Sequence, residues 1–215
     1  MQHYTTGMVK LYDYAGSANC YKIKLLLAQL QRSYETVDVE IFRGESRTLE
    51  FLAKNPAGRV PVLEVSPGEY LAESNAILCY LASGTALWPE APLPRAQVLQ
   101  WLFFEQYEVE PTVGSVRFWK LTGRDKAQGS LLERKTAQGQ EALRSLDRHL
   151  EHRTFLVGEA YSIADIALYA YTHVAEDGSG FTLDPLPAVR RWLKRIEEQP
   201  HWLPGPAPYS AAAYP

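Results

Sequence analysis

The sequence predicts a two-domain protein, in which a small α/β domain precedes a larger all-helical domain. In residues 9–83, short β-prone segments alternate with helical patterns in the order βαβαββα. After this part the strand signal disappears, and apolar residues recur at helical spacing. Residues 84–94 contain three prolines and indicate a linker. We therefore expect domains at 9–83 and 95–200 and an irregular, Pro- and Ala-rich tail at 201–215.

The first domain is expected to form a mixed four-stranded sheet. Residues 9–14 and 34–41 alternate as strands do, and Ile23, Leu26, Leu27 and Leu30 have the spacing of one helix face. The later elements expected are a helix at 47–54, a strand at 62–65, a hairpin turn at 66–69, a strand at 70–71 and a helix at 74–82. A strand, a crossover helix, a parallel strand and a hairpin together give the thioredoxin-like arrangement.

The second domain is expected to contain only helices. The pattern predicts a long helix at 95–121, bent at Pro111 or Gly114, and another at 130–152. Ser162 and Asp165 have the spacing of a capping box, so we assign them a structural role at the start of a buried helix. Pro187 opens the last predicted helix.

Composition excludes several classes of function. The 215 residues are 46% hydrophobic and carry a formal charge of −3, whereas a dedicated nucleic-acid binder is usually basic. No apolar run approaches the roughly 18 residues of a membrane span, and no Cys/His cluster suggests a metal site. Residues 1–8 are polar and lack an apolar export signal, and we do not expect them to be part of the fold. We therefore expect a cytoplasmic protein whose two cysteines, Cys20 and Cys79, are reduced.

The stretch from residue 55 to residue 77 has features of a peptide-binding site. Pro61 precedes a short apolar strand, and a cis Val60–Pro61 bond would expose the Val60 backbone to an extended ligand. Glu73, Ser74 and Asn75 then begin a helix, where free N–H groups and a hydroxyl suit a carboxylate. Each piece alone fits an ordinary turn, strand or capped helix, but the order of the pieces is more specific.

These residues resemble a known family. The run Gly58-Arg-Val-Pro-Val-Leu63 followed by Glu73-Ser-Asn-Ala-Ile77 looks like the glutathione-binding half of the soluble glutathione S-transferases, and Ser162-Ile-Ala-Asp165 is similar to a capping box in their helical domain. The resemblance implies that glutathione is the co-substrate. The Val60 backbone would pair with its cysteinyl part, Ser74 would hold the γ-glutamyl carboxylate, Glu73 the ammonium group, and Arg59 the glycyl carboxylate. Asn55 is interpreted as a turn residue.

The family's reaction requires a donor that stabilises the glutathione thiolate at the first strand–helix turn. Ser17 matches the catalytic serine of the serine-type classes and could also be a simple N-cap. Asn19 stands where those classes often have proline, and its amide is a second candidate. Tyr12 and Tyr14 are further candidates, which alternation would place on one face of the strand. Cys20 continues an apolar stripe and is expected, like Cys79, to be a buried structural thiol.

The family resemblance leaves three functions open. The first is conjugation of glutathione to small hydrophobic electrophiles, as in detoxification, by a homodimer without nucleic-acid or membrane partners. The electrophile would lie between the domains, with the candidate residues Tyr107, Pro111, Val113, Arg117, Phe118 and Trp119. The second is glutathione-dependent disulfide reduction, which should depend on position 19 or 20. The third is a non-catalytic interaction module that binds glutathione weakly.

Overall fold

A computed structural model describes residues 8–214 and contains the expected mixed four-stranded sheet. Its strands are β1 (Val9–Asp13), β2 (Tyr34–Asp38), β3 (Val62–Ser66) and β4 (Glu69–Ala72), in the spatial order β2-β1-β3-β4. β1 is parallel to β2 and antiparallel to β3, and β3 and β4 form an antiparallel hairpin. The thioredoxin-like prediction for the first domain is therefore confirmed.

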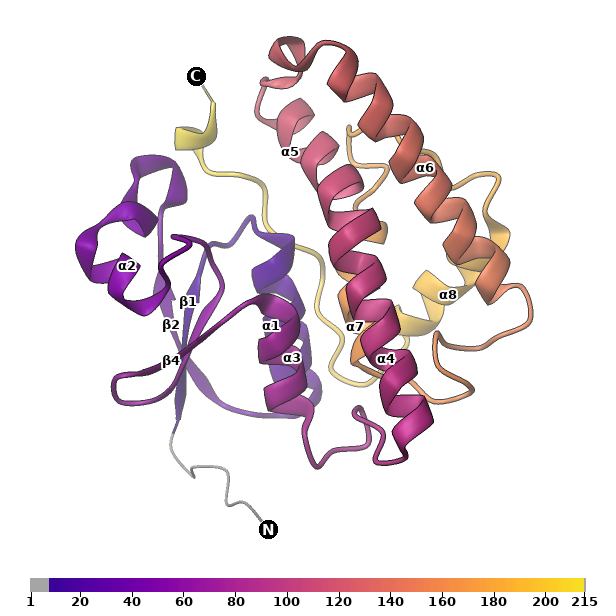
Figure 1. The fold of residues 1–215 in the computed structure, drawn as a ribbon, viewed down its shortest axis with the longest axis horizontal. Helices are drawn as coiled ribbons and strands as arrows, with labels where there is room; N and C mark the ends of the chain where they lie inside the picture. Colours follow the sequence, from indigo (N-terminus) through magenta and orange to yellow (C-terminus); the bar gives the residue numbers. More distant parts are fainter. Residues whose placement is uncertain (1–7, 215) are drawn as a thin grey trace.

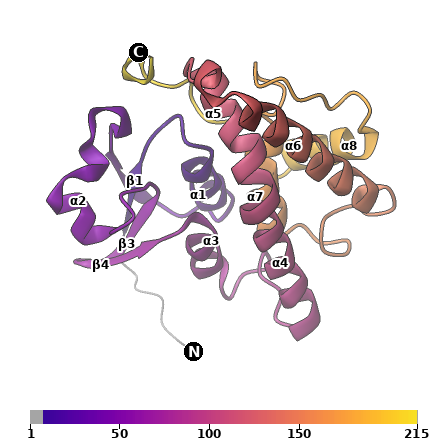
Figure 2. The same cartoon turned by 45° about the horizontal axis from the view of Figure 1, so that its top comes forward.

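Helices cover both faces of this sheet. α1 (Ala18–Gln29) and α3 (Ser74–Ala82) lie on the face toward the second domain, and α2 (Leu49–Lys54) lies on the other side (Figures 1 and 2). Alternation along β1 explains the two layers, because Val9 and Leu11 enter the main core while Tyr12 packs with Phe51 of α2. The first helix therefore lies between the sheet and the helical domain, where its N-terminus can contribute to an interdomain site.

The second domain is all-helical, as predicted. It contains α4 (Pro92–Phe104), α5 (Ser115–Leu121), α6 (Ser130–Leu150), α7 (Ile163–Thr172) and α8 (Pro187–Glu197). Between α4 and α5 lies η3 (Glu105–Gly114), a segment of π-helix that contains Pro111. The sequence predicted a bend near Pro111 or Gly114, and the structure has this widened segment there. Such segments are rare and often occur at functional sites.

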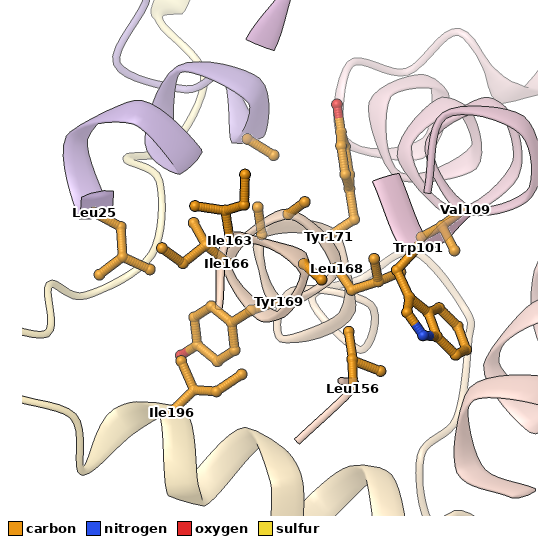
Figure 3. Close-up of a cluster of buried hydrophobic side chains, with 14 of the residues drawn as sticks. Leu25, Trp101, Val109, Leu156, Ile163, Ile166, Leu168, Tyr169, Tyr171 and Ile196 are labelled. Carbon is orange, nitrogen blue, oxygen red and sulfur yellow. The ribbon is translucent and has the colours of Figure 1, made fainter. Parts of the chain in front are cut away.

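α7 is the centre of the helical core, and every residue from Ile163 to Thr172 is buried. Figure 3 shows its side chains radiating toward neighbouring elements, with Tyr169 and Tyr171 on opposite sides of the helix. The Asp165 carboxylate accepts hydrogen bonds from the Ser162 and Leu156 backbone N–H groups and from Trp192 Nε1 of α8. Asp165 is therefore a structural hub, in agreement with the role assigned from the sequence.

Several element boundaries differ from the prediction. The strand expected at 34–41 ends at Asp38, and a 3-10 turn follows at Ile41–Arg43. A second turn, Glu45–Arg47, precedes α2, whose N-cap is Thr48. α4 begins at Pro92, within the predicted linker, because proline is well tolerated in the first turn of a helix.

The tail after α8 is mostly irregular, as expected, with a 3-10 turn at Ala211–Ala213. In Figure 1 it returns along the boundary between the domains, and its 3-10 turn lies over the first domain, in contact with the turn at Ile41–Arg43. Within residues 8–214, no helix is long and apolar enough to cross a membrane. The same part of the chain holds no group of three or more His, Cys, Asp or Glu side chains arranged for a metal ion.

Candidate functional site

The entrance to β3 has the expected backbone geometry. The Val60–Pro61 peptide bond is cis. Asn55 shapes the preceding turn, since its Nδ2 donates to the Arg59 carbonyl at 2.8 Å and its Oδ1 accepts from the Ala57 N–H at 3.0 Å. This agrees with the interpretation of Asn55 as a turn residue. The Val60 backbone therefore lies just before β3, after a turn that Asn55 holds in place.

The start of α3 combines an unusual backbone with a buried hydroxyl. Glu73 precedes the helix with φ of 68° and ψ of 112°, a conformation that L-residues rarely adopt and that is concentrated at functional sites. Ser74 is 5% exposed. Its hydroxyl donates to Asn19 Oδ1 at 3.1 Å and accepts from Lys22 Nζ at 3.3 Å. The predicted anion-binding serine therefore already belongs to a polar network with α1.

Ser17 is the N-cap of α1, and its Oγ accepts from the Cys20 N–H at 3.2 Å. The Ser17 hydroxyl also lies within hydrogen-bonding reach of the Cys20 thiol, a weak acceptor, and the residue lines a cleft between the domains. N-terminal amides of a helix add partial positive charge at this point. Ser17 can therefore cap the helix and also donate to an anion in the cleft.

Asn19 connects the two domains. Its Nδ2 donates to Glu110 Oε1 of η3 at 2.9 Å, while its Oδ1 accepts from Ser74. The carboxylate of Glu110 also accepts a hydrogen bond from Gln106. The Asn19 amide therefore has hydrogen-bond partners in both domains.

Two adjacent hollows contain these residues. The smaller has a volume of about 40 Å³, and its lining includes Asn19, Asn55, Val60, Pro61, Glu73 and Ser74. The larger is a cleft of about 610 Å³ whose lining includes Ser17 and residues from η3, α5 and α7. Arg59, Gln106 and Glu110 line both. The structure thus gathers all six site residues predicted from the sequence around two hollows that share one wall.

Only one of the two tyrosine candidates lines the cleft. β1 ends at Asp13, so Tyr14 lies in the turn and its ring lines the large cleft. Tyr12 instead packs against α2, and its hydroxyl donates to Glu64 at 3.2 Å. Burial and the Glu64 charge raise the Tyr12 pKa. Tyr14 alone remains a tyrosine candidate next to the cleft.

Cys20 is fully buried and its Sγ accepts from the Tyr14 N–H at 3.5 Å. Burial raises the pKa of this thiol, which keeps it protonated. Cys79 is partly buried against the core, and burial raises its pKa to about 11. Neither thiol is set up as a nucleophile, consistent with the structural roles expected for both.

The electrophile candidates separate into two groups. Pro111, Arg117, Phe118 and Trp119 line the large cleft. Val113 is a fully buried core residue, and Tyr107 is 81% exposed. These two do not belong to the cleft because they lie on other faces of the same helical stretch.

Two aromatic residues that line the cleft, Tyr171 and Tyr209, are not among the candidates predicted from the sequence. Tyr171 of α7 lines it, with the ring against Gly114, where an added Cβ would approach to 2.6 Å. Tyr209 of the tail stacks on Tyr14 with ring centroids 6.3 Å apart. The tail is held there by the Ser210 N–H, which donates to the Tyr14 hydroxyl at 2.8 Å. Tyr209 lies far along the chain in an irregular segment, so no periodic signal marks it.

Comparison with known proteins identifies the family. Residues 7–83 match the glutathione S-transferase N-terminal domain, and residues 100–200 match the glutathione S-transferase C-terminal domain. The chain belongs to the glutathione S-transferase family.

Two curated relatives illustrate the breadth of this family. The disulfide-bond oxidoreductase YfcG of Escherichia coli is 33% identical over 200 residues, which cover 90% of this chain and 92% of YfcG. Elongation factor 1-gamma of Drosophila melanogaster is 30% identical over 200 residues, or 89% of this chain. The matched region spans only 45% of the elongation factor.

Solved structures of two bacterial proteins share the fold of this chain. A possible glutathione S-transferase from Rhodopseudomonas palustris is 48% identical, with a TM-score of 0.89, and the match covers 92% of this chain and 98% of that one. A glutathione transferase family member from Pseudomonas fluorescens with two glutathione bound is 29% identical, with a TM-score of 0.81 and coverage of 93% and 92%. Related proteins of this fold therefore bind glutathione.

Proposed function

We propose that this glutathione S-transferase family member binds glutathione, stabilises its thiolate and transfers it to a small hydrophobic electrophile. The observation that carries the proposal is the position of Ser17, which caps the N-terminus of α1 and lines the large cleft. The adjoining small hollow offers the Val60 backbone and Ser74. A tripeptide thiol held there would have its sulfur near Ser17.

Glutathione would replace internal hydrogen bonds of the small hollow. Ser74 would exchange Asn19 for the γ-glutamyl carboxylate, while Lys22 keeps a positive charge beside the serine. Glu73 would pair with the ammonium group, and Arg59 would approach the glycyl carboxylate. This exchange would free Asn19 Oδ1, which can only accept. The Nδ2 group has two N–H donors, of which one bonds Glu110, so the other makes Asn19 the second candidate for donation to sulfur.

The energy required for thiolate stabilisation is modest. A free thiol has a pKa near about 8.5, and a shift of about two units corresponds to roughly 2.7 kcal/mol. A hydrogen bond to a charged group contributes about 1.5–3 kcal/mol, and a helix N-terminus adds about 0.3–1 kcal/mol. The Ser17 hydroxyl and the end of α1 are together sufficient. The thiol proton goes to solvent, and the thiolate then attacks the electrophile.

The test is the thiolate absorbance of the protein titrated with glutathione at neutral pH. Ser17→Ala should abolish most of this band and raise the apparent pKa of bound glutathione by more than one unit, while Ser130→Ala, at the exposed start of α6, should leave both unchanged. A band that survives in Ser17→Ala but disappears in Asn19→Ala would transfer the role to Asn19. Saturable binding without a band would contradict the transferase proposal.

Glutathione-dependent disulfide reduction is the second candidate, because YfcG is named a disulfide-bond oxidoreductase. The buried, protonated Cys20 makes a protein-thiol mechanism at that position unfavourable. Disulfide exchange would instead use the same glutathione thiolate, so it should track Ser17 or Asn19. Absence of glutathione binding would favour the third function, a non-catalytic interaction module.

We also propose a cytoplasmic homodimer. Leu93 and Phe103 of α4 and Tyr107 of η3 are 69%, 69% and 81% exposed. Large apolar side chains on one helical stretch are typical of a surface that is covered in an assembly. Light scattering should give about twice the 24.3 kDa chain mass, and Phe103→Glu should shift the protein toward the monomer.

A further inference from the structure

The large cleft contains a buried cation that has no counter-ion. Arg117 of α5 lines this cleft and is 6% exposed. Its Nε is buried without a hydrogen-bond partner, and its Nη1 donates to the Tyr209 hydroxyl at 3.3 Å. Among residues 8–214, no carboxylate forms an ion pair with this guanidinium.

Neighbouring groups neutralise Arg117 only in part. The Tyr209 ring lies 5.4 Å from the Arg117 Cζ atom, at the distance of a cation–π contact. Glu110 lines the same cleft, but its oxygens accept from Asn19 and Gln106. Burial lowers the pKa of the nearby His173 to about 4, so this histidine is uncharged at neutral pH and adds no second cation beside Arg117. A desolvated guanidinium in this setting is unfavourable unless an anion completes its shell.

The walls around Arg117 are aromatic. Tyr14 and Tyr209 stack with an interplanar angle of 14°, and Phe118 meets Tyr209 edge-on with centroids 5.9 Å apart. Trp119 and Tyr171 complete the aromatic lining. A planar ring can stack on such walls while a carboxylate on that ring reaches the guanidinium, whose planar fork suits two parallel hydrogen bonds.

We infer that the second substrate of this cleft is an aromatic electrophile that carries a carboxylate, and that Arg117 is the residue that selects for it. The inference rests on the proposed glutathione transfer, and it names the substrate class for that reaction. With a chloronitrobenzoate whose chlorine is ortho to the nitro group, the glutathione thiolate forms a C–S bond to the carbon that bears chlorine. The C–Cl bond breaks, and chloride leaves with the electron pair.

Binding is measured by calorimetry with nitrobenzoate and nitrobenzamide, which have no leaving group, so the result is independent of turnover. In the unsubstituted protein the acid should bind about tenfold more tightly than the amide, as expected for a hydrogen bond to a charged group. Arg117→Met should remove this preference, Arg117→Lys should retain part of it, and Arg144→Met, on the exposed surface of α6, should leave it intact. An acid that binds no better than the amide to the unsubstituted protein overturns the inference, even if Arg117→Met fails to fold.

Turnover is then compared for the chloronitrobenzoate and the matching chloronitrobenzamide. Arg117→Met should lower kcat/KM for the acid by about tenfold relative to the amide, and should leave the dissociation constant of glutathione unchanged. An equal loss for both electrophiles, with weaker glutathione binding, would assign Arg117 to glutathione and overturn the inference. Selective binding of nitrobenzoate without a thiolate band would support the anion site and refute the transferase proposal alone.

Discussion

The contact between the domains includes a fully buried ion pair, so its removal should be strongly destabilising. Lys22 of α1 places its Nζ 2.9 Å from Glu105 Oε1 of η3, and both side chains are 0% exposed. This Oε1 makes no well-aligned hydrogen bond, so the contact is mainly electrostatic, whereas Oε2 accepts from Asn75 at 2.9 Å. Lys22→Met would remove the positive charge at similar side-chain length and leave the Glu105 carboxylate buried.

The expected loss follows from the uncompensated charge. Removal of one partner of a buried pair typically costs about 3–5 kcal/mol, whereas replacement of both charges by neutral groups is often close to neutral. The double variant Lys22→Met with Glu105→Gln keeps an oxygen that can accept from Asn75. It should therefore recover more than half of the loss.

Urea unfolding measures both effects, with the free energy of unfolding taken from the midpoint and slope. The matched control is Lys10→Met, which breaks the partly exposed pair between Lys10 and Glu35 and should cost less than about 1 kcal/mol. A loss below about 1 kcal/mol in Lys22→Met would refute the argument. So would a double variant no more stable than Lys22→Met, because the two losses must be coupled if the charges compensate each other.

Three further predictions concern the site and the tail. Ser74→Ala should raise the dissociation constant of glutathione by about tenfold in calorimetry with little effect on the chemical step, since it removes a contact to the carboxylate; an unchanged constant would contradict the assignment. His173 is neutral in the folded protein, because burial lowers its pKa from 6.5 to about 4, so stability should be lost as pH falls from 6.5 toward 4, by about 3 kcal/mol in total. His173→Phe should abolish this part of the pH dependence, read as the difference between two series of urea midpoints, and parallel series would refute it. Gly114→Ala should destabilise the protein by about 1–3 kcal/mol, because the new methyl group meets the Tyr171 ring at 2.6 Å; an unchanged urea midpoint would show that the ring can move.

The sequence predicted residues that the structure gathers around the two hollows, because the signals for these residues are local. The turn before Pro61, the start of α3 at Ser74 and the N-cap Ser17 each depend on a few neighbouring residues. Turn chemistry and capping preferences act over such short distances. Their placement around shared hollows follows from the sheet order, which the βαβαββα pattern already implied.

The other features of the site depend on tertiary contacts, which a sequence pattern does not reveal. Helical periodicity cannot distinguish a π-helical segment from an α-helix, so the widened turns around Pro111 were predicted only as a bend. Tyr14 lies in the turn after β1, because the strand ends one residue earlier than the predicted range 9–14. The bond between Asn19 and Glu110 joins residues that only the docking of the two domains brings together.

Part of the wall of the large cleft comes from the tail after α8, which lies outside the main helices and strands. Tyr209 lines this cleft, and a few contacts hold the tail around it. The Ala207 N–H donates to the Ala15 carbonyl at 3.1 Å, and Arg124 Nη1 donates to the Ala213 carbonyl at 2.7 Å. Core packing restricts substitutions on α7, whereas irregular surface segments accept changes more freely. Under the proposed function, substitutions in this tail would change the choice of electrophile without altering the residues proposed to bind glutathione.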